Sequence, residues 1–410
     1  MALDQGRIEL ECTMDEQDVV VLDSGSGYLK VGFSGEDAPR AVLPTAVATT
    51  TAEAVFEEEQ AGGGGDGTQQ KKSQAFFGDE AVMQAGASVV RPVCRGEIGQ
   101  TQISKDALES LWEHVFRNVL GVEQEDLPVL IADPQPLGQA AYNSRAWMAE
   151  VMFEKLKVKS LAIFNTAVLA LFSTGKTRGL VVESGEGITR AVPVFEGYAI
   201  PHAIFKMEVA GQDVTSAVQS LMMKEEEGAQ FAPDLRVMQS LKEKACTVAL
   251  THRASMQSVK DTADEEMRSF ELPDGKIIQV PQKIRQGAPE VLFGNGAKDK
   301  PSMQKICMEA IDTCDLDFKQ DLIKSVLVAG GTTMLPGIAA RLRHELSHML
   351  PKEMGHQVDI CVDSQRRYAA WIGGSMFASL STFDQVAITK QEYEEGKSDR
   401  GVSLVARKTF

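Results

Sequence analysis

The chain has 410 residues, of which 43% are hydrophobic and 24% are charged, a composition typical of a globular protein. This length exceeds what one hydrophobic core usually organises, so we expect two lobes or domains. The excess of 58 acidic over 42 basic residues gives a net charge of -16, which disfavours direct binding to nucleic acid or to an anionic membrane. No segment approaches the roughly 18 consecutive apolar residues that cross a bilayer. The N-terminus lacks an apolar signal core and the six cysteines lack CxxC spacing, so we expect a reducing interior compartment.

Short apolar runs alternate with amphipathic stretches along the chain. Residues 107–120 and 143–156 have the spacing of amphipathic helices. Strands that alternate with helices indicate an α/β protein with mixed sheets. Buried strands are predicted at 19–22, 127–132, 161–164, 179–183 and 325–330.

Residues 52–73 interrupt this pattern. They contain three consecutive glutamates, four consecutive glycines and then QQKK, so no buried face can be drawn on them. We expect a flexible surface loop, and an insertion without function is an equally weighted interpretation.

The chain contains one internal repeat. VVVLDSGSGYLK (19–30) and GLVVESGEGITR (179–190) share an apolar strand, an acidic residue, Ser-Gly, one polar residue, Gly and the start of a second strand. Such glycines let backbone N–H groups approach anionic oxygens, and an acidic residue at a strand end can hold a hydrated Mg²⁺. Two such hairpins predict similar sheets that face each other across a cleft and bind nucleotide phosphates.

A third glycine turn, VLVAGGTTMLPGI (326–338), follows another predicted strand. Gly330 and Gly331 would let a flat base or ribose approach the backbone, with Met334 and Leu335 as apolar cover. A simple strand-to-helix turn explains the same residues equally well.

Several segments together closely resemble the actin family: DSGSGYLKVGFSGEDAPRAVLP (23–44), EGYAIPHAI (196–204), VAGQDVT (209–215), VLVAGGTTMLPGI, RRYAAWIGGSMFASLSTFDQVAITKQEY (366–393) and the C-terminal RKTF. The resemblance implies an α/β actin-like fold, two lobes with duplicated mixed β-sheets flanked by helices around a nucleotide cleft. It places residues 1–173 and 368–410 in a small lobe, with a divergent loop at about 45–75, and residues 174–367 in a large lobe.

The resemblance also implies a site for ATP or ADP with Mg²⁺. Asp23 and Glu183 would hold the metal through waters, and Lys30 would reach the phosphates. Arg367 stands where the family usually has lysine. The implied nucleotide-binding residues are Asp23, Ser24, Gly25, Ser26, Gly27, Tyr28, Lys30, Gly185, Glu186, Gly187, Gly211, Asp213, Lys242, Glu243, Gly330, Gly331, Thr332, Met334, Leu335 and Arg367.

The sequence departs from the family pattern at the residues nearest the reacting phosphate. Thr166 replaces the glutamine that orients water, Glu183 and Glu186 replace two aspartates, and Arg190 and Arg95 replace two histidines. The threonine hydroxyl is shorter than an amide and cannot reproduce its contacts. If the protein is an ATP hydrolase of the actin type, we therefore expect slow or absent hydrolysis with nucleotide binding retained. Alternatively, Glu183 reaches the metal directly and Arg190 acts as an electrophile, which would preserve turnover.

Two features bear on assembly. The loop through which actin subunits join is replaced by the 52–73 segment, which offers little apolar surface apart from Val55 and Phe56, and the apolar plug after APEVLF is shortened to GNGAKDKPSMQK. We therefore expect impaired self-polymerisation. A groove that accepts an amphipathic helix of a protein partner is expected to be intact, although core packing explains Ile372 and Leu380 equally well. The groove positions are Phe172, Gly175, Thr177, Tyr198, Ile372, Met376, Leu380 and Thr382.

The sequence thus predicts an actin-like nucleotide-binding subunit or adaptor of a larger cytoskeletal or motile assembly in the cytoplasm, with other actin-like subunits as further candidate partners. One alternative is a polymerising, ATP-hydrolysing actin or a dynactin-type actin-related protein. The others are an axonemal dynein-associated subunit in a cilium and a chromatin-remodeller subunit in the nucleus.

Overall fold

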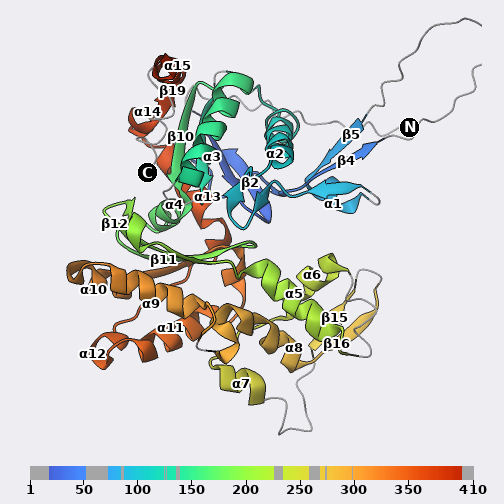
Figure 1. The fold of residues 1–410 in the computed structure, drawn as a ribbon, viewed down its shortest axis with the longest axis vertical. Coiled ribbons are helices and arrows are strands. Elements are labelled where there is room, and N and C mark those ends of the chain that lie inside the picture. The colour runs from blue at the N-terminus through green and yellow to red at the C-terminus, as the bar shows by residue number, and fades with distance from the viewer. Residues whose placement is uncertain are drawn as a thin grey trace, which may run out of the picture.

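The protein is built as two halves, each organised around a mixed β-sheet (Figure 1). This computed structural model describes residues 18–51, 73–84, 87–123, 125, 127–134, 139–225, 234–257, 268–272, 275–297 and 299–398. Most of the predicted loop at 52–73, with Val55 and Phe56, and the C-terminal RKTF lie outside these residues. Within the described part of the chain, every helix is too short or too polar to cross a bilayer.

The first sheet has the strand order β19-β10-β9-β1-β2-β3. Strand β1 runs parallel to β9 and antiparallel to β2. The apolar runs predicted at 19–22, 127–132 and 161–164 form β1, β9 and β10, which confirms them as buried strands. The strands are β1 (Val20–Ser24), β2 (Tyr28–Phe33), β3 (Ala41–Pro44), β9 (Pro128–Asp133), β10 (Ser160–Asn165) and β19 (Ile388–Thr389).

The second sheet repeats this arrangement with the order β13-β12-β11-β17-β18, and β14 also pairs with β12. Strand β11 is antiparallel to β12 and parallel to β17, as β1 is to β2 and β9. The sequence repeat of 19–30 and 179–190 is therefore a repeat of structure. The strands are β11 (Gly179–Ser184), β12 (Thr189–Phe195), β13 (Tyr198–Ala199), β14 (Phe205–Met207), β17 (Val326–Ala329) and β18 (Ile360–Cys361).

Two helices, α4 (Thr166–Phe172) and α13 (Ala369–Ala378), form a layer between the two sheets. Leu169 of α4 packs in one core with Val21 of the first sheet. Other residues of α4 pack with Val181 of the second sheet. The helices touch so closely that a Cβ at Gly373 would overlap the carbonyl oxygen of Leu169. Glycine is therefore required at this crossing.

The remaining helices lie outside this central layer (Figure 1). In the first half, Thr101 and Ser104 form a capping box that starts the longest of these helices. The first-half helices are α1 (Gly78–Met83), α2 (Gln102–His114) with a π-helical extension (Val115–Leu120), α3 (Gln139–Glu150) with a second extension (Val151–Lys155), α14 (Phe383–Val386) and α15 (Lys390–Ser398). The amphipathic helices predicted at 107–120 and 143–156 are thus confirmed.

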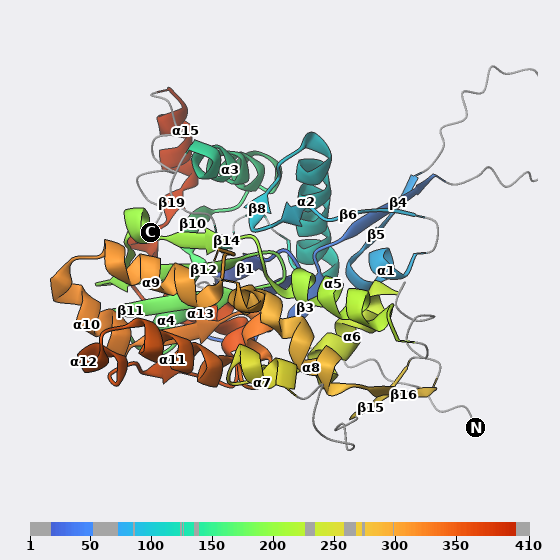
Figure 2. The same ribbon diagram turned by 60° about the horizontal axis from the view of Figure 1, so that its bottom comes forward.

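In the second half, α9 to α12 gather at one end, and α5, α6 and α8 lie at the other (Figures 1 and 2). The helices are α5 (Gly211–Met222), α6 (Leu235–Ala245), α7 (His252–Gln257), α8 (Gln282–Gly287), α9 (Met303–Thr313), α10 (Leu316–Lys324), α11 (Ile338–Met349) and α12 (Lys352–Gly355). Short 3₁₀ turns occupy Pro201–Ala203, Ala288–Gly296, Gly331–Met334 and Arg366–Tyr368.

Two small β elements extend from the two halves on the same side (Figure 1). They are the sheet of β4 (Val47–Thr51), β5 (Ser73–Phe77) and β6 (Ser88–Val90), and the hairpin of β15 (Arg268–Glu271) with β16 (Ile277–Val280). A further hairpin joins β7 (Val93–Cys94) and β8 (Glu97–Ile98). Because β4 and β5 pair antiparallel, the divergent loop expected at about 45–75 is ordered into strands at both ends.

Candidate functional site

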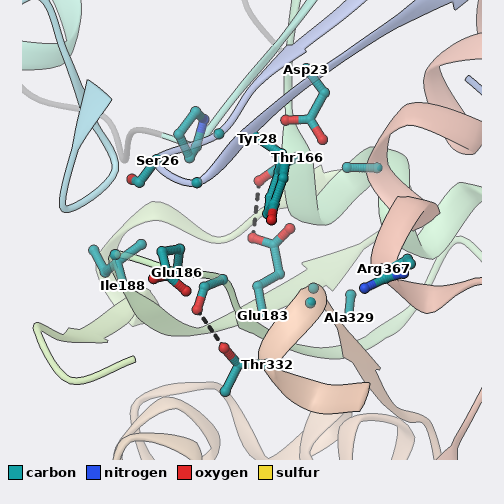
Figure 3. Close-up of a pocket in the computed structure, with 18 of the residues that line it drawn as sticks. Asp23, Ser26, Tyr28, Thr166, Glu183, Glu186, Ile188, Ala329, Thr332 and Arg367 are labelled. Carbon is teal, nitrogen blue, oxygen red and sulfur yellow. Dashed lines mark hydrogen bonds between the residues drawn. The ribbon is translucent and has the colours of Figure 1, made fainter. Parts of the chain in front are cut away.

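A pocket of about 470 Å³ lies where the two halves meet (Figure 3). One wall comes from the turn between β1 and β2, and the opposite wall from the turn between β11 and β12. Helix α6, the turn after β17 and the Arg366–Tyr368 turn complete it. The volume is in the range of small-molecule sites.

The two glycine turns are closed in the same way and touch each other. Gly25 N–H donates to the Tyr28 carbonyl at 3.1 Å, and Gly185 N–H donates to the Ile188 carbonyl at 3.1 Å. A Cβ on Gly27 would lie 2.9 Å from the Cβ of Glu186 in the facing turn. Glycine is therefore required for the turns to approach this closely.

Each turn is flanked by an acidic residue and a basic residue that are direct cross-strand partners. Asp23 lies opposite Lys30, and Lys30 Nζ donates to Asp23 Oδ2 at 2.9 Å. Glu183 lies opposite Arg190 in the equivalent register, and Arg190 Nη2 donates to Glu183 Oε2. Both hairpins thus carry an ion pair at the same place beside the pocket.

Thr166 joins the second of these pairs. It is the first residue of α4, whose N-terminus is capped by the Asn165 side chain. Its hydroxyl accepts from Arg190 Nη2 at 2.7 Å and donates to Glu183 Oε2 at 3.0 Å. Arg190 is only 3% exposed, and its Nε and Nη1 have no hydrogen-bond partner among the described residues. Three of the four predicted catalytic side chains, Thr166, Glu183 and Arg190, are therefore bonded to one another.

Other side chains around the pocket are cationic or polar. Lys242 of α6 donates from Nζ to Glu186 Oε2 at 3.2 Å and to the Gly211 carbonyl at 3.1 Å. Tyr28 accepts from the Gln239 side chain, and burial raises the pKa of its phenol. Figure 3 shows Arg367 and Thr332 on the same side of the pocket as Glu183, across from Asp23 and Ser26.

Most of the nucleotide-binding residues implied by the resemblance line this pocket, and three do not. Ser24 is buried and its hydroxyl accepts from Trp112 Nε1 at 3.1 Å. Gly211 and Asp213 lie behind the wall, where Asp213 caps α5 through the Ala210 N–H. Thr166, Glu183, Glu186 and Arg190 line the pocket, as do Asp23, Gly25, Ser26, Gly27, Tyr28, Lys30, Gly185, Gly187, Lys242, Glu243, Gly330, Gly331, Thr332, Met334, Leu335 and Arg367.

Sequence reasoning missed several lining residues. Arg366 could have been found as the neighbour of Arg367, because both belong to one short turn. The others carry no chemical signal in the sequence and reach the pocket through the fold: Val42, Gly96, Pro134, Ile188, Ala329, Tyr368 and Ala370.

Arg95 connects the two halves beside the pocket. It stands at the turn between β7 and β8 with φ of 50°. Its Nη1 and Nη2 donate to Asp213 at 2.7 Å and 3.1 Å, and Nη1 also donates to the Glu208 carbonyl. The hydrogen bond to Asp213 raises the pKa of Arg95. A weaker contact, Lys206 to Glu97 at 3.7 Å, joins the same hairpin to β14.

The acidic side chains suit a divalent metal only in part. Asp23 and its glycine turn fit a hydrated Mg²⁺, which typically needs one or two carboxylates. Glu183 fits less well, because both Arg190 and Thr166 bind its Oε2, whereas the Asp23 carboxylate is bonded by Lys30. Among the described residues, no three His, Cys, Asp or Glu side chains gather around a common metal position.

The pocket nevertheless suits an anion. Five cationic side chains line it, namely Lys30, Arg190, Lys242, Arg366 and Arg367, against the four acidic ones Asp23, Glu183, Glu186 and Glu243. The difference is a net charge of +1 in a chain whose total is -16. The site therefore attracts an anionic ligand against the field of the whole protein.

The residues predicted to line the partner groove do not all line one hollow. Ile372 and Met376 line a hollow of about 430 Å³ together with Glu36 and Asp37. Tyr198, Met376 and Leu380 are exposed by 60%, 41% and 43%. The remaining positions, Phe172, Gly175, Thr177, Tyr198, Leu380 and Thr382, do not line that hollow.

Two equivalent sheets, each with a glycine turn that faces the other across a polar pocket, define a duplicated α/β fold of the actin-like class. The family model described as Actin matches residues 14–410. The chain therefore belongs to the actin family, as the sequence motifs indicated.

Proposed function

We propose that this actin-family protein binds ATP or ADP in the pocket between its halves and hydrolyses ATP slowly or not at all. It would serve as a subunit or adaptor of a larger cytoskeletal or motile assembly in the cytoplasm. The net positive pocket and the two facing glycine turns support the nucleotide proposal.

The cluster of Thr166, Glu183 and Arg190 carries the proposal of weak hydrolysis. Hydrolysis requires a water held in line with the terminal phosphate by a positioning side chain. The Thr166 hydroxyl donates its only proton to Glu183 and accepts from Arg190, which leaves one lone pair and no donor to orient that water. If the attacking water is displaced by about 1 Å, the rate of hydrolysis can fall on the order of a hundredfold.

The binding residues have separate tasks in this proposal. Lys30 and the backbone N–H groups of the glycine turns hold the phosphates, while Met334 and Leu335 cover the base. A bound Mg²⁺ would neutralise phosphate charge, with Asp23 as its water-mediated ligand. Because the ligand contacts both halves, it stabilises the folded protein by mass action.

The assembly proposal concerns protein partners. We propose that an amphipathic helix of a partner docks against the exposed side chains of Tyr198, Met376 and Leu380. The polar composition of residues 52–73 supports impaired self-polymerisation. Sedimentation at micromolar concentration tests this point, and clean polymerisation coupled to phosphate release would favour a hydrolysing filament protein instead.

The proposal is tested by purifying the protein with its native partners and identifying the bound nucleotide. We expect ATP, or a mixture of ATP and ADP, at close to one nucleotide per chain. An empty pocket would exclude the nucleotide proposal, and ADP alone after loading with ATP would exclude the proposal of slow hydrolysis.

A further inference from the structure

Arg190 holds the same place in the second hairpin that Lys30 holds in the first. Lys30 lies opposite Asp23 across β1 and β2, and Arg190 lies opposite Glu183 across β11 and β12. Each cation pairs with its opposite acid, and both line the same pocket. The fold thus places two cations symmetrically about the position between the glycine turns.

Two nitrogens of the Arg190 guanidinium have no hydrogen-bond partner among the described residues. Nη2 makes both of its hydrogen bonds, to Thr166 and Glu183, whereas Nε and Nη1 are shielded from solvent and have no partner among the described residues. Buried donors without partners are costly, since each loses its hydrogen bonds to water. A phosphate oxygen in the pocket would give one of these N–H groups a charged acceptor, and a hydrogen bond between two charged groups is stronger than a neutral one.

Because Glu183 is paired with Arg190, its carboxylate is a weaker ligand for a divalent metal ion. A carboxylate that already balances a buried arginine attracts a divalent cation less than a free one does. Glu186 is likewise paired, to Lys242. Of the two other acidic side chains that line the pocket, Asp23 is paired with Lys30, and Glu243 accepts a hydrogen bond from Gln239 of the same helix.

We propose that Arg190 contacts the phosphates of the bound nucleotide and supplies charge neutralisation that would otherwise come from a divalent metal. This inference rests on the proposed nucleotide binding and adds that binding depends little on Mg²⁺. The cation at position 190 and the metal then act as alternatives.

The test is the dissociation constant of ATP, measured by titration calorimetry on the full chain with Mg²⁺ and with excess EDTA. For the native protein the two values should agree within about tenfold. Arg190→Gln should weaken binding in EDTA by more than about tenfold and make binding metal-dependent, because it removes the cation and frees Glu183. The charge control is Arg178→Gln, which removes an exposed arginine that does not line the pocket. Its dissociation constants for ATP should match those of the native protein.

A second variant keeps the test decisive if Arg190→Gln fails to fold. Glu183→Gln retains the guanidinium and removes its acidic partner, so binding in EDTA should stay at the native level or tighten. Loss of binding by Glu183→Gln in Mg²⁺ would show that Glu183 serves the metal and would overturn the inference.

The outcomes separate this inference from the proposal on which it rests. If the native protein binds ATP with Mg²⁺ but loses more than about tenfold in EDTA, the role of Arg190 is wrong and nucleotide binding stands. If it binds ATP in neither buffer, nucleotide binding itself is refuted.

Discussion

Arg95 is predicted to control how fast nucleotide leaves the pocket. It is the side chain that bonds the β7–β8 hairpin of the first half to Asp213 at the start of α5 in the second half. Two charge-assisted hydrogen bonds contribute about 1.5–3 kcal/mol each in favourable settings. Both side chains are partly exposed, at 31% and 28%, so solvent screening reduces this figure. We estimate that the contact stabilises the closed arrangement by about 1–2 kcal/mol, which is ~5- to 30-fold in an equilibrium constant.

The assay is the release rate of a fluorescent ATP analogue, chased with excess unlabelled ATP in a stopped-flow instrument. Arg95→Ala should accelerate release by about 5- to 30-fold, because opening then breaks fewer contacts. The matched control is Lys206→Ala, since Lys206 bonds Glu97 of the same hairpin at 3.7 Å. This exposed pair should change the rate by less than about threefold. Equal effects of the two variants, or none from Arg95→Ala, would refute the idea that Arg95 holds the halves together.

Three further predictions concern packing and burial. Gly187→Ala should weaken ATP binding in calorimetry by at least about tenfold, because its Cβ would lie 2.7 Å from the facing turn and push the turns apart. Arg341→Leu should lower the free energy of unfolding by about 3–5 kcal/mol in urea titrations, because it leaves Glu290 buried without its cation. In the native protein, a maleimide reagent should modify exposed Cys94 and spare Cys307, since burial raises the pKa of the Cys307 thiol, and modification of Cys307 before unfolding would contradict its burial.

Much of the fold could be predicted because its signals are local. The run at 19–22 and the run at 179–183 are apolar and end at Ser-Gly, so each indicated a buried strand that enters a turn. Their similarity then predicted the duplication that the two sheets confirm. The threonines of β4 gave no such signal, and its pairing with β5 depends on partners distant in sequence.

The pocket was harder to predict than the sheets. The resemblance to the actin family identified Glu183 and Arg190 as changed residues, but only the register of β11 and β12 shows that they face each other. The hydrogen bonds of Thr166 to both of them depend on where α4 begins relative to the second sheet. Asp213 carried a motif signal and was expected at the pocket, yet its carboxylate faces Arg95, an ion pair that no local pattern predicts.

We propose that the site holds ATP better than it cleaves it. The most direct test is phosphate release in a single turnover of bound γ-labelled ATP, compared between the native protein and Thr166→Gln/Arg190→His. We expect the ATP bound to the native protein to remain intact. The double variant should release phosphate faster, because the amide introduced at position 166 is free to orient water. Rapid, complete release of phosphate by the native protein would contradict the proposal of slow hydrolysis.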